Sequence, residues 1–108
     1  MTELERILVG QTESHVDVFH GGVLVHREAI VGLVELKLRA EKDGILLTLA
    51  SGFRGFEAQL RIWNAKCMGK RDLVDAGGKL LDFASLDDEQ IVSAILRWSA
   101  LPGATSLP

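Results

Sequence analysis

The feature that most restricts the fold of this chain is the continuous apolar run Ile45–Ala50, which lies between Gly44 and Gly52. A short apolar run bounded by turn residues is typical of a β-strand that is buried on both faces. Such a strand needs a neighbour on each side. One candidate is an N-terminal hairpin, in which segments 16–19 and 23–26 flank a His-Gly-Gly bend. No segment after residue 100 supplies the second neighbour, so the predicted sheet is unfinished.

Amphipathic patterns on both sides of this run predict helices. Before it, the apolar residues of segment 30–38 recur at helical spacing, and Gly44 supplies the stop that a helix end favours. After it, Phe56, Leu60 and Trp63 occupy one face of a second helix.

The last third of the chain predicts a loop followed by a third helix. Segment 68–83 lacks a periodic pattern and contains a Gly-Gly turn signal. Ser85 and Asp88 have the spacing of a capping box, which opens a helix, and Pro102 and Gly103 end it. The predicted buried face of this helix consists of Ile91, Val92, Ile95, Leu96 and Trp98.

Together these elements predict a single α+β domain over residues 1–108, in which a small antiparallel sheet packs against about three helices. The apolar run 6–9 is a further short strand candidate. Because one neighbour of the main strand is missing, we expect an incomplete domain. Its unpaired sheet edge would allow oligomers to form.

Composition excludes several classes of function. The net charge of −3 gives no basic surface, so no nucleic-acid partner is expected. No apolar run approaches the about 18–20 residues that span a bilayer, so no membrane span is expected either. The first ten residues carry Glu3 and Glu5 and lack the apolar core of a secretory signal. The chain as written is therefore expected in the cytoplasm.

Arg54 is the strongest functional candidate, because it follows the apolar run directly and lies between two glycines. A guanidinium at the end of a strand can project into a cleft, where it holds a carboxylate or stabilises an oxyanion. The alternative is a structural ion pair with a neighbouring acid, of which Glu57 is nearest in sequence.

The remaining titratable residues favour structural roles. His15, His20 and His26 lie near the hairpin, but their spacing matches no metal-binding signature. The acidic run 87–89 lies in a first helical turn, where carboxylates stabilise the helix dipole. Cys67 is the sole cysteine, which excludes an internal disulfide and a cysteine-rich zinc site, and it is expected to be a half-buried apolar residue near a helix end.

The segments ASGFRGFEAQLRIWNAK (50–66) and ILRWSALPG (95–103) resemble the VanY-type D-alanyl-D-alanine carboxypeptidases. These are zinc metallopeptidases that trim the stem peptides of peptidoglycan, at the cell wall or in the periplasm. The resemblance extends over about residues 26–103. It implies that Arg54 interacts with substrate or transition-state oxygens, as a catalytic and substrate-binding residue, and that Ser51 and Gln59 contribute to substrate binding.

The resemblance also implies a zinc site beyond the ALPG segment, where the family carries two histidines, an aspartate and a glutamate base. Here that segment is followed by ATSLP, residues 104–108, which contains none of these residue types. We therefore expect no zinc ligands and no bound zinc in this chain, which then corresponds to the N-terminal part of a peptidase domain. The zinc-bearing strands of the family pair with the strand before Arg54, which also accounts for the unfinished sheet.

Three functions remain open from the sequence. The first is a D-alanyl-D-alanine carboxypeptidase-like protein, whose partner is a peptide ending in D-Ala-D-Ala and which is inactive without its zinc ligands. The second is a non-catalytic module that binds a peptide or cell-wall fragment through Arg54. The third is a poorly stable product of a degraded reading frame.

Overall fold

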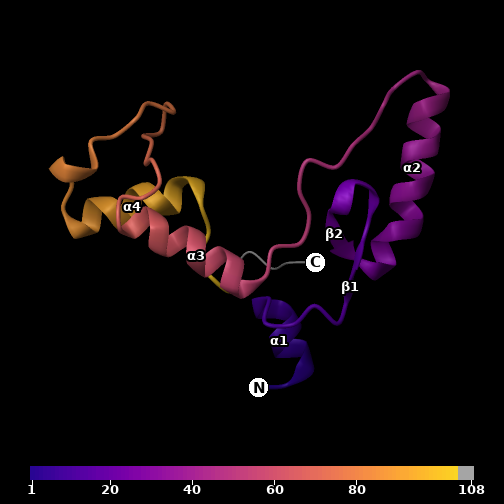
Figure 1. Ribbon diagram of the computed structural model, residues 1–108, viewed down its shortest axis with the longest axis horizontal. Helices are drawn as coiled ribbons and strands as arrows, with labels where there is room; N and C mark the ends of the chain where they lie inside the picture. The colour runs from indigo at the N-terminus through magenta and orange to yellow at the C-terminus, as the bar shows by residue number, and fades with distance from the viewer. Residues whose placement is uncertain (105–108) are drawn as a thin grey trace.

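A computed structural model describes residues 1–104, and its helices and strands confirm the α+β class. Figure 1 shows the strands as one antiparallel hairpin beside α2, with the α3–α4 pair at the other end of the molecule. The elements are α1 (Glu3–Val9), β1 (Val16–Val18), β2 (Leu24–His26), α2 (Ile30–Lys42), α3 (Phe56–Cys67) and α4 (Asp88–Trp98), with single 3-10 turns at His20–Gly22, Arg27–Ala29 and Phe83–Ser85.

The hairpin predicted from the sequence is confirmed. In the antiparallel register Asp17 faces Val25, and the backbone N–H of Phe19 donates to the Val23 carbonyl at 2.7 Å beside the bend. Gly21 has a φ of 79°, a left-handed conformation that side chains other than glycine rarely adopt. The His-Gly-Gly sequence is therefore what allows the chain to reverse here.

The strand predicted at residues 6–9 is wrong, because this segment belongs to α1. Thr2 Oγ1 accepts from the Glu5 N–H at 3.2 Å, and Glu5 Oε2 accepts from the Thr2 N–H at 2.6 Å. This capping box begins the helix, and Gly10 ends it with a φ of 77°. The Thr-x-x-Glu spacing was visible in the sequence, and it overrides the β propensity of a run of only four residues.

The helices predicted on both sides of the apolar run are confirmed as α2 and α3. Gly44 follows α2 with a φ of 74°, as expected of a helix stop. α2 buries none of its residues, and Val31 is 70% exposed although it lies on the apolar face. The pattern thus predicted the helix correctly, but among residues 1–104 no element covers that face.

The buried strand predicted at Ile45–Ala50 is wrong in this structure. The segment is extended, but Ile45 and Leu46 are 56% and 78% exposed, and Leu47 and Leu49 are half-buried. Its two ends are fixed by the Ile45 N–H, which donates to the Ala40 carbonyl, and by the Phe53 N–H, which donates to the Leu24 carbonyl at 2.6 Å. Between these ends, no described neighbour offers the hydrogen bonds that would make it a strand.

The third predicted helix is confirmed as α4, with two corrections. Its N-cap is Asp87, which forms a capping box with Gln90, whereas the Ser85 hydroxyl donates to the Asp82 carbonyl. Ile91 and Ile95 are buried, but the other members of the predicted apolar face are exposed, namely Val92, Leu96 and Trp98. The acidic residues at the start of α4 stabilise the helix, as expected.

The main core lies between α3, α4 and the loop that joins them. Leu73, Ile91 and Ile95 are buried there, and Cys67 packs against them half-buried, as the sequence predicted. The predicted turn is present, since Val74 pairs with Leu80 and the Asp75 carboxylate accepts from the Lys79 N–H at 2.9 Å.

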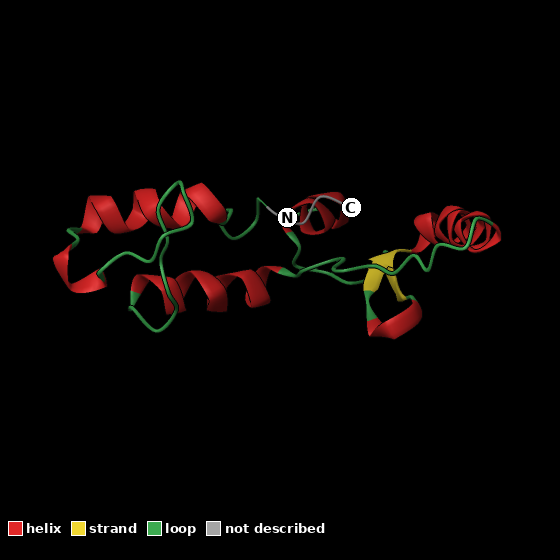
Figure 2. Cartoon of the chain, turned by 90° about the horizontal axis from the view of Figure 1, so that it is seen from above, coloured by secondary structure: helices red, strands yellow, loops and turns green. Residues whose placement is uncertain are grey.

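The chain as a whole is extended rather than compact. Its radius of gyration is 17.4 Å, against about 13 Å for a compact domain of this length. Figure 2 shows the hairpin and α2 at one end and the α3–α4 pair at the other, joined by extended chain. No helix within residues 1–104 is long and apolar enough to cross a membrane.

Gly52 allows the end of the apolar segment to approach β2 closely. A Cβ at this position would lie 2.1 Å from the Leu24 carbonyl oxygen, whereas a Cβ at Gly32, inside α2, would meet nothing within 4 Å. We expect Gly52→Ala to lower the free energy of unfolding by about 1–3 kcal/mol through this clash. Gly32→Ala is expected to raise it by about 0.5–1 kcal/mol, because alanine favours a helix interior.

Denaturant unfolding of both variants measures these changes. Equal stability of Gly52→Ala and the unmodified chain would contradict the close packing of residue 52 against β2.

Candidate functional site

Arg54 lies between the end of the extended segment and the first residue of α3, and its side chain is exposed. Its Nη1 donates to Gln59 Oε1 at 2.9 Å. Within residues 1–104 it forms no ion pair, so the proposed structural pair with Glu57 is absent. The guanidinium is therefore oriented by a neutral partner, the amide of Gln59.

Gln59 is the residue that orients Arg54. Its side chain is 1% exposed, although it is polar and lies in the first turns of α3. The amide Nε2 donates to the Ala100 carbonyl at 2.8 Å, across 41 positions of the sequence. One buried amide therefore holds the arginine with its oxygen and the chain after α4 with its nitrogen, which satisfies both of its polar ends.

Lys66 adds a second cation to the site, from the face of α3 that carries Gln59. Its Nζ donates to the Ser99 hydroxyl, next to the carbonyl that Gln59 binds. Partial burial lowers the pKa of the Lys66 ammonium below its usual 10.5, and the charges of Arg71 and Arg54 lower it further. The site is thus electropositive, and among the described residues no carboxylate forms an ion pair with Arg54 or Lys66.

The sequence predicted two members of this site and missed two. Arg54 and Gln59 lie together as expected, whereas the sequence did not single out Lys66 and Ser99 as members of a site. The signal for Lys66 was its place seven residues after Gln59, which is two helical turns along the same face. Ser99 had no such signal, because its position depends on how α4 packs against α3.

Ser51 does not join this hydrogen-bonded network. It lines a separate cavity of about 290 Å³ beside the hairpin, together with His15, His26 and apolar residues such as Leu49. The predicted set Ser51, Arg54 and Gln59 is therefore divided between two places in the structure.

The histidines do not form a metal site. His15 is buried against Phe53 in an edge-to-face contact at 5.3 Å, and neither of its ring nitrogens has a hydrogen-bond partner. His26 lies near it, but His20 and Asp17 are exposed. No group of three or more potential metal ligands occurs within residues 1–104. Since zinc sites use at least three protein ligands, the described residues do not fit a zinc ion.

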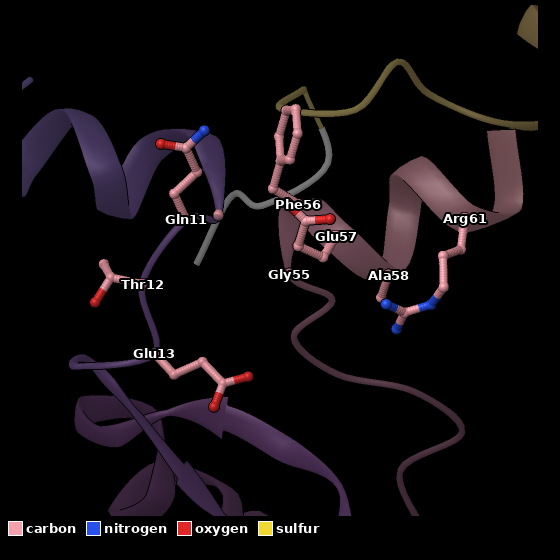
Figure 3. Close-up of a pocket in the computed structure, with 9 residues that line it drawn as sticks. Gln11, Thr12, Glu13, Gly55, Phe56, Glu57, Ala58 and Arg61 are labelled. Carbon is pink, nitrogen blue, oxygen red and sulfur yellow. The ribbon is translucent and has the colours of Figure 1, made fainter. Parts of the chain in front are cut away.

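A larger cavity, of about 660 Å³, lies between residues 10–13 and the N-terminus of α3. Figure 3 shows Gln11, Thr12 and Glu13 on one side of it and Glu57, Ala58 and Arg61 on the other. Arg54 does not line this cavity, whose charged residues have both signs. It therefore lacks the uncompensated positive charge that surrounds Gln59.

Comparisons with known proteins place the chain in context. A family model for D-alanyl-D-alanine carboxypeptidases, VanY, matches residues 22–106. An uncharacterized protein of Haemophilus influenzae is 49% identical over 74 residues, which are 68% of this chain and 51% of that protein. The chain therefore spans about half the length of the curated relative that it matches.

A similar fold occurs in a solved structure. It is the crystal structure of a mutant of the vancomycin resistance D,D-pentapeptidase VanY, from a VanB-type resistance cassette, in complex with Zn(II). The two chains superpose with a TM-score of 0.58 at 22% sequence identity, over 83% of this chain and 44% of the other.

The role of the Gln59 amide can be tested by removing it. Gln59→Leu keeps the side-chain volume but leaves the Ala100 carbonyl without its partner, so we expect a loss of about 1–3 kcal/mol in the free energy of unfolding. Gln11→Leu, at an exposed position, is the matched control and should change stability by less than about 0.5 kcal/mol. Thermal and denaturant unfolding measure both; equal effects would contradict the bridging role.

Proposed function

The chain belongs to the VanY family of D-alanyl-D-alanine carboxypeptidases, and from this premise we propose that its described residues bind the terminal carboxylate of a peptide ending in D-Ala-D-Ala. The observation that carries the proposal is the side chain of Arg54, which Gln59 orients and which no carboxylate within residues 1–104 neutralises.

The geometry of Arg54 supports carboxylate binding. The guanidinium spends one N–H on Gln59, and its remaining N–H groups can form the paired hydrogen bonds that arginine makes with a carboxylate. Lys66 raises the local positive potential without competing for the same ligand atoms, because its ammonium is held by Ser99. A free peptide carboxylate supplies a negative charge that no described residue pairs with Arg54 or Lys66.

We do not expect the described residues to hydrolyse the peptide. In zinc peptidases the metal activates the attacking water and polarises the scissile carbonyl. The described residues contain no group that fits the metal, so we propose binding without turnover. This corresponds to a non-catalytic peptide-binding role on a carboxypeptidase-like fold.

Binding of N-acetyl-Lys-D-Ala-D-Ala by calorimetry tests the role of Arg54. We expect Arg54→Ala to weaken binding at least tenfold, because a charge-assisted pair is lost. The affinity of Arg54→Lys should lie between those of Arg54→Ala and the unmodified chain, because lysine keeps the charge but not the paired hydrogen bonds. Arg61→Ala, an exposed arginine in the neighbouring helix α3, is the matched control and should leave binding unchanged.

Two outcomes would contradict this proposal. One is equal affinity for the same peptide with an amidated C-terminus, which has no carboxylate. The other is turnover: the purified chain would release D-alanine from the peptide when zinc is added, and Arg54→Ala would abolish this release.

Lys66 gives the binding a dependence on pH. Its pKa in the free protein lies below 10.5, and a bound carboxylate would favour the charged ammonium and so raise that pKa. Binding therefore takes up a proton, and affinity is expected to fall as the pH rises from 7 towards 10.5.

Calorimetry at several pH values tests this dependence. Lys66→Gln should bind more weakly at pH 7 and lose the decrease of affinity with pH, whereas Lys70→Gln, at an exposed position, should keep it. An identical slope in Lys66→Gln would assign the effect to another group.

A further inference from the structure

We propose that Trp98, at the end of α4, is a positioning residue for Arg54 and acts on it through the chain that follows the helix. The predicted loss of peptide affinity rests on the carboxylate binding proposed above. The predicted loss of orientation does not, because it is measured on the free protein.

The side chain of Trp98 is exposed but fixed in place. The sequence places it on the buried face of α4, whereas the structure leaves 54% of it exposed. Its indole N–H donates to the Asp75 carbonyl at 3.0 Å, across 23 positions of the sequence. This hydrogen bond, rather than burial in the core, ties the last residue of α4 to the loop that precedes the helix.

The carbonyl of Asp75 belongs to a tightly bonded turn. The Asp75 carboxylate accepts from the Gly77 and Lys79 N–H groups, each at 2.9 Å. The Asp75 N–H donates to the Lys79 carbonyl at 2.8 Å. The turn is also held to the core, because the Leu81 N–H donates to the carbonyl of the buried residue Leu73. The indole is therefore attached to a fixed point of the loop.

The two residues after Trp98 carry this attachment to the candidate site. α4 ends at Trp98, and Ser99 is extended, with a φ of −140° and a ψ of 150°. The Ser99 hydroxyl accepts from the Lys66 Nζ. The Ala100 carbonyl accepts from the Gln59 Nε2 at 2.8 Å. Both acceptors lie within two residues of the indole, so a displacement of Trp98 would move them relative to α3.

The direction of Arg54 depends on these contacts because Gln59 is its hydrogen-bond partner among residues 1–104. If the Ala100 carbonyl moved away, the buried Gln59 Nε2 would be left without an acceptor. The amide would then have to rotate or shift to find one, and the guanidinium would lose the oxygen that orients it. Trp98 therefore reaches Arg54 through Gln59.

Nuclear magnetic resonance of the free protein tests this orientation. Trp98→Phe keeps an aromatic ring but removes the N–H. We expect the Gln59 side-chain amide and the Arg54 Nε–H signals to shift towards those of solvent-exposed groups. Leu96→Ala is the matched control, because Leu96 is 48% exposed on the same helix and should leave both signals in place. Circular dichroism would verify that both variants keep their helices.

A pair of changes in the turn separates the anchor from the aromatic ring itself. Asp75→Ala keeps Trp98 but removes the carboxylate that holds the turn, so the same signals should move in the same direction. Asp75→Asn keeps a side-chain oxygen that can accept from the turn N–H groups, so it should restore the signals of the unmodified chain.

Calorimetry with N-acetyl-Lys-D-Ala-D-Ala measures the consequence for binding. We expect Trp98→Phe to weaken binding about threefold to tenfold, in line with the net contribution of one hydrogen bond. Leu96→Ala should leave the affinity unchanged. In the Gln59→Leu background, Trp98→Phe should weaken binding no further, because both changes remove the same orientation of Arg54.

Unchanged Gln59 and Arg54 signals in Trp98→Phe would overturn the proposal, as would equal shifts in Leu96→Ala. Additive losses of affinity in the Gln59→Leu, Trp98→Phe double variant would also overturn it. If the unmodified chain does not bind the peptide, the proposed function fails, and the signals of the free protein still decide whether Trp98 orients Arg54.

Discussion

The buried amide of Gln59 is the interaction on which the candidate site depends. It joins three segments, because it lies in α3, accepts from Arg54 before the helix and donates to the carbonyl of Ala100 after α4. A buried amide with both ends satisfied has one favourable orientation, since rotation would place two donors or two acceptors together. Packing of α4 on α3 therefore determines the direction of the Arg54 side chain, and the fold and the site are coupled at this residue.

The electrostatics of the site follow from the same packing. α4 delivers Ser99 and Ala100 to α3, which draws the Lys66 ammonium into a partly buried position near Arg54. Like charges that are held close without a carboxylate raise the free energy of the unbound site, and an anion relieves this cost. The half of the molecule around the hairpin differs, because several large apolar side chains of α2 and of the extended segment are exposed there, such as Val31 and Leu46.

The sequence predicted local structure well where one short-range pattern decides it. The periodicity before Gly44 and after Gly55 predicted α2 and α3, and the glycine bend predicted the hairpin, because these elements depend on neighbours within a few residues. It failed at Ile45–Ala50, since a strand exists only through its partners. For the same reason Arg54 and Gln59 could be nominated from a motif, whereas Ser99 entered the site only through tertiary packing. The periodicity likewise did not predict that the apolar face of α2 is exposed, because exposure depends on which other elements pack against the helix.

The most direct test of this account is the nuclear magnetic resonance signal of the Gln59 side-chain amide, followed together with the Arg54 Nε–H during addition of N-acetyl-Lys-D-Ala-D-Ala. A buried amide that binds the Ala100 carbonyl should exchange slowly with water before any peptide is added. The account predicts that peptide then shifts the Arg54 signal most strongly and the Gln59 amide with it. A rapidly exchanging Gln59 amide, or peptide-induced shifts confined to other residues, would contradict it.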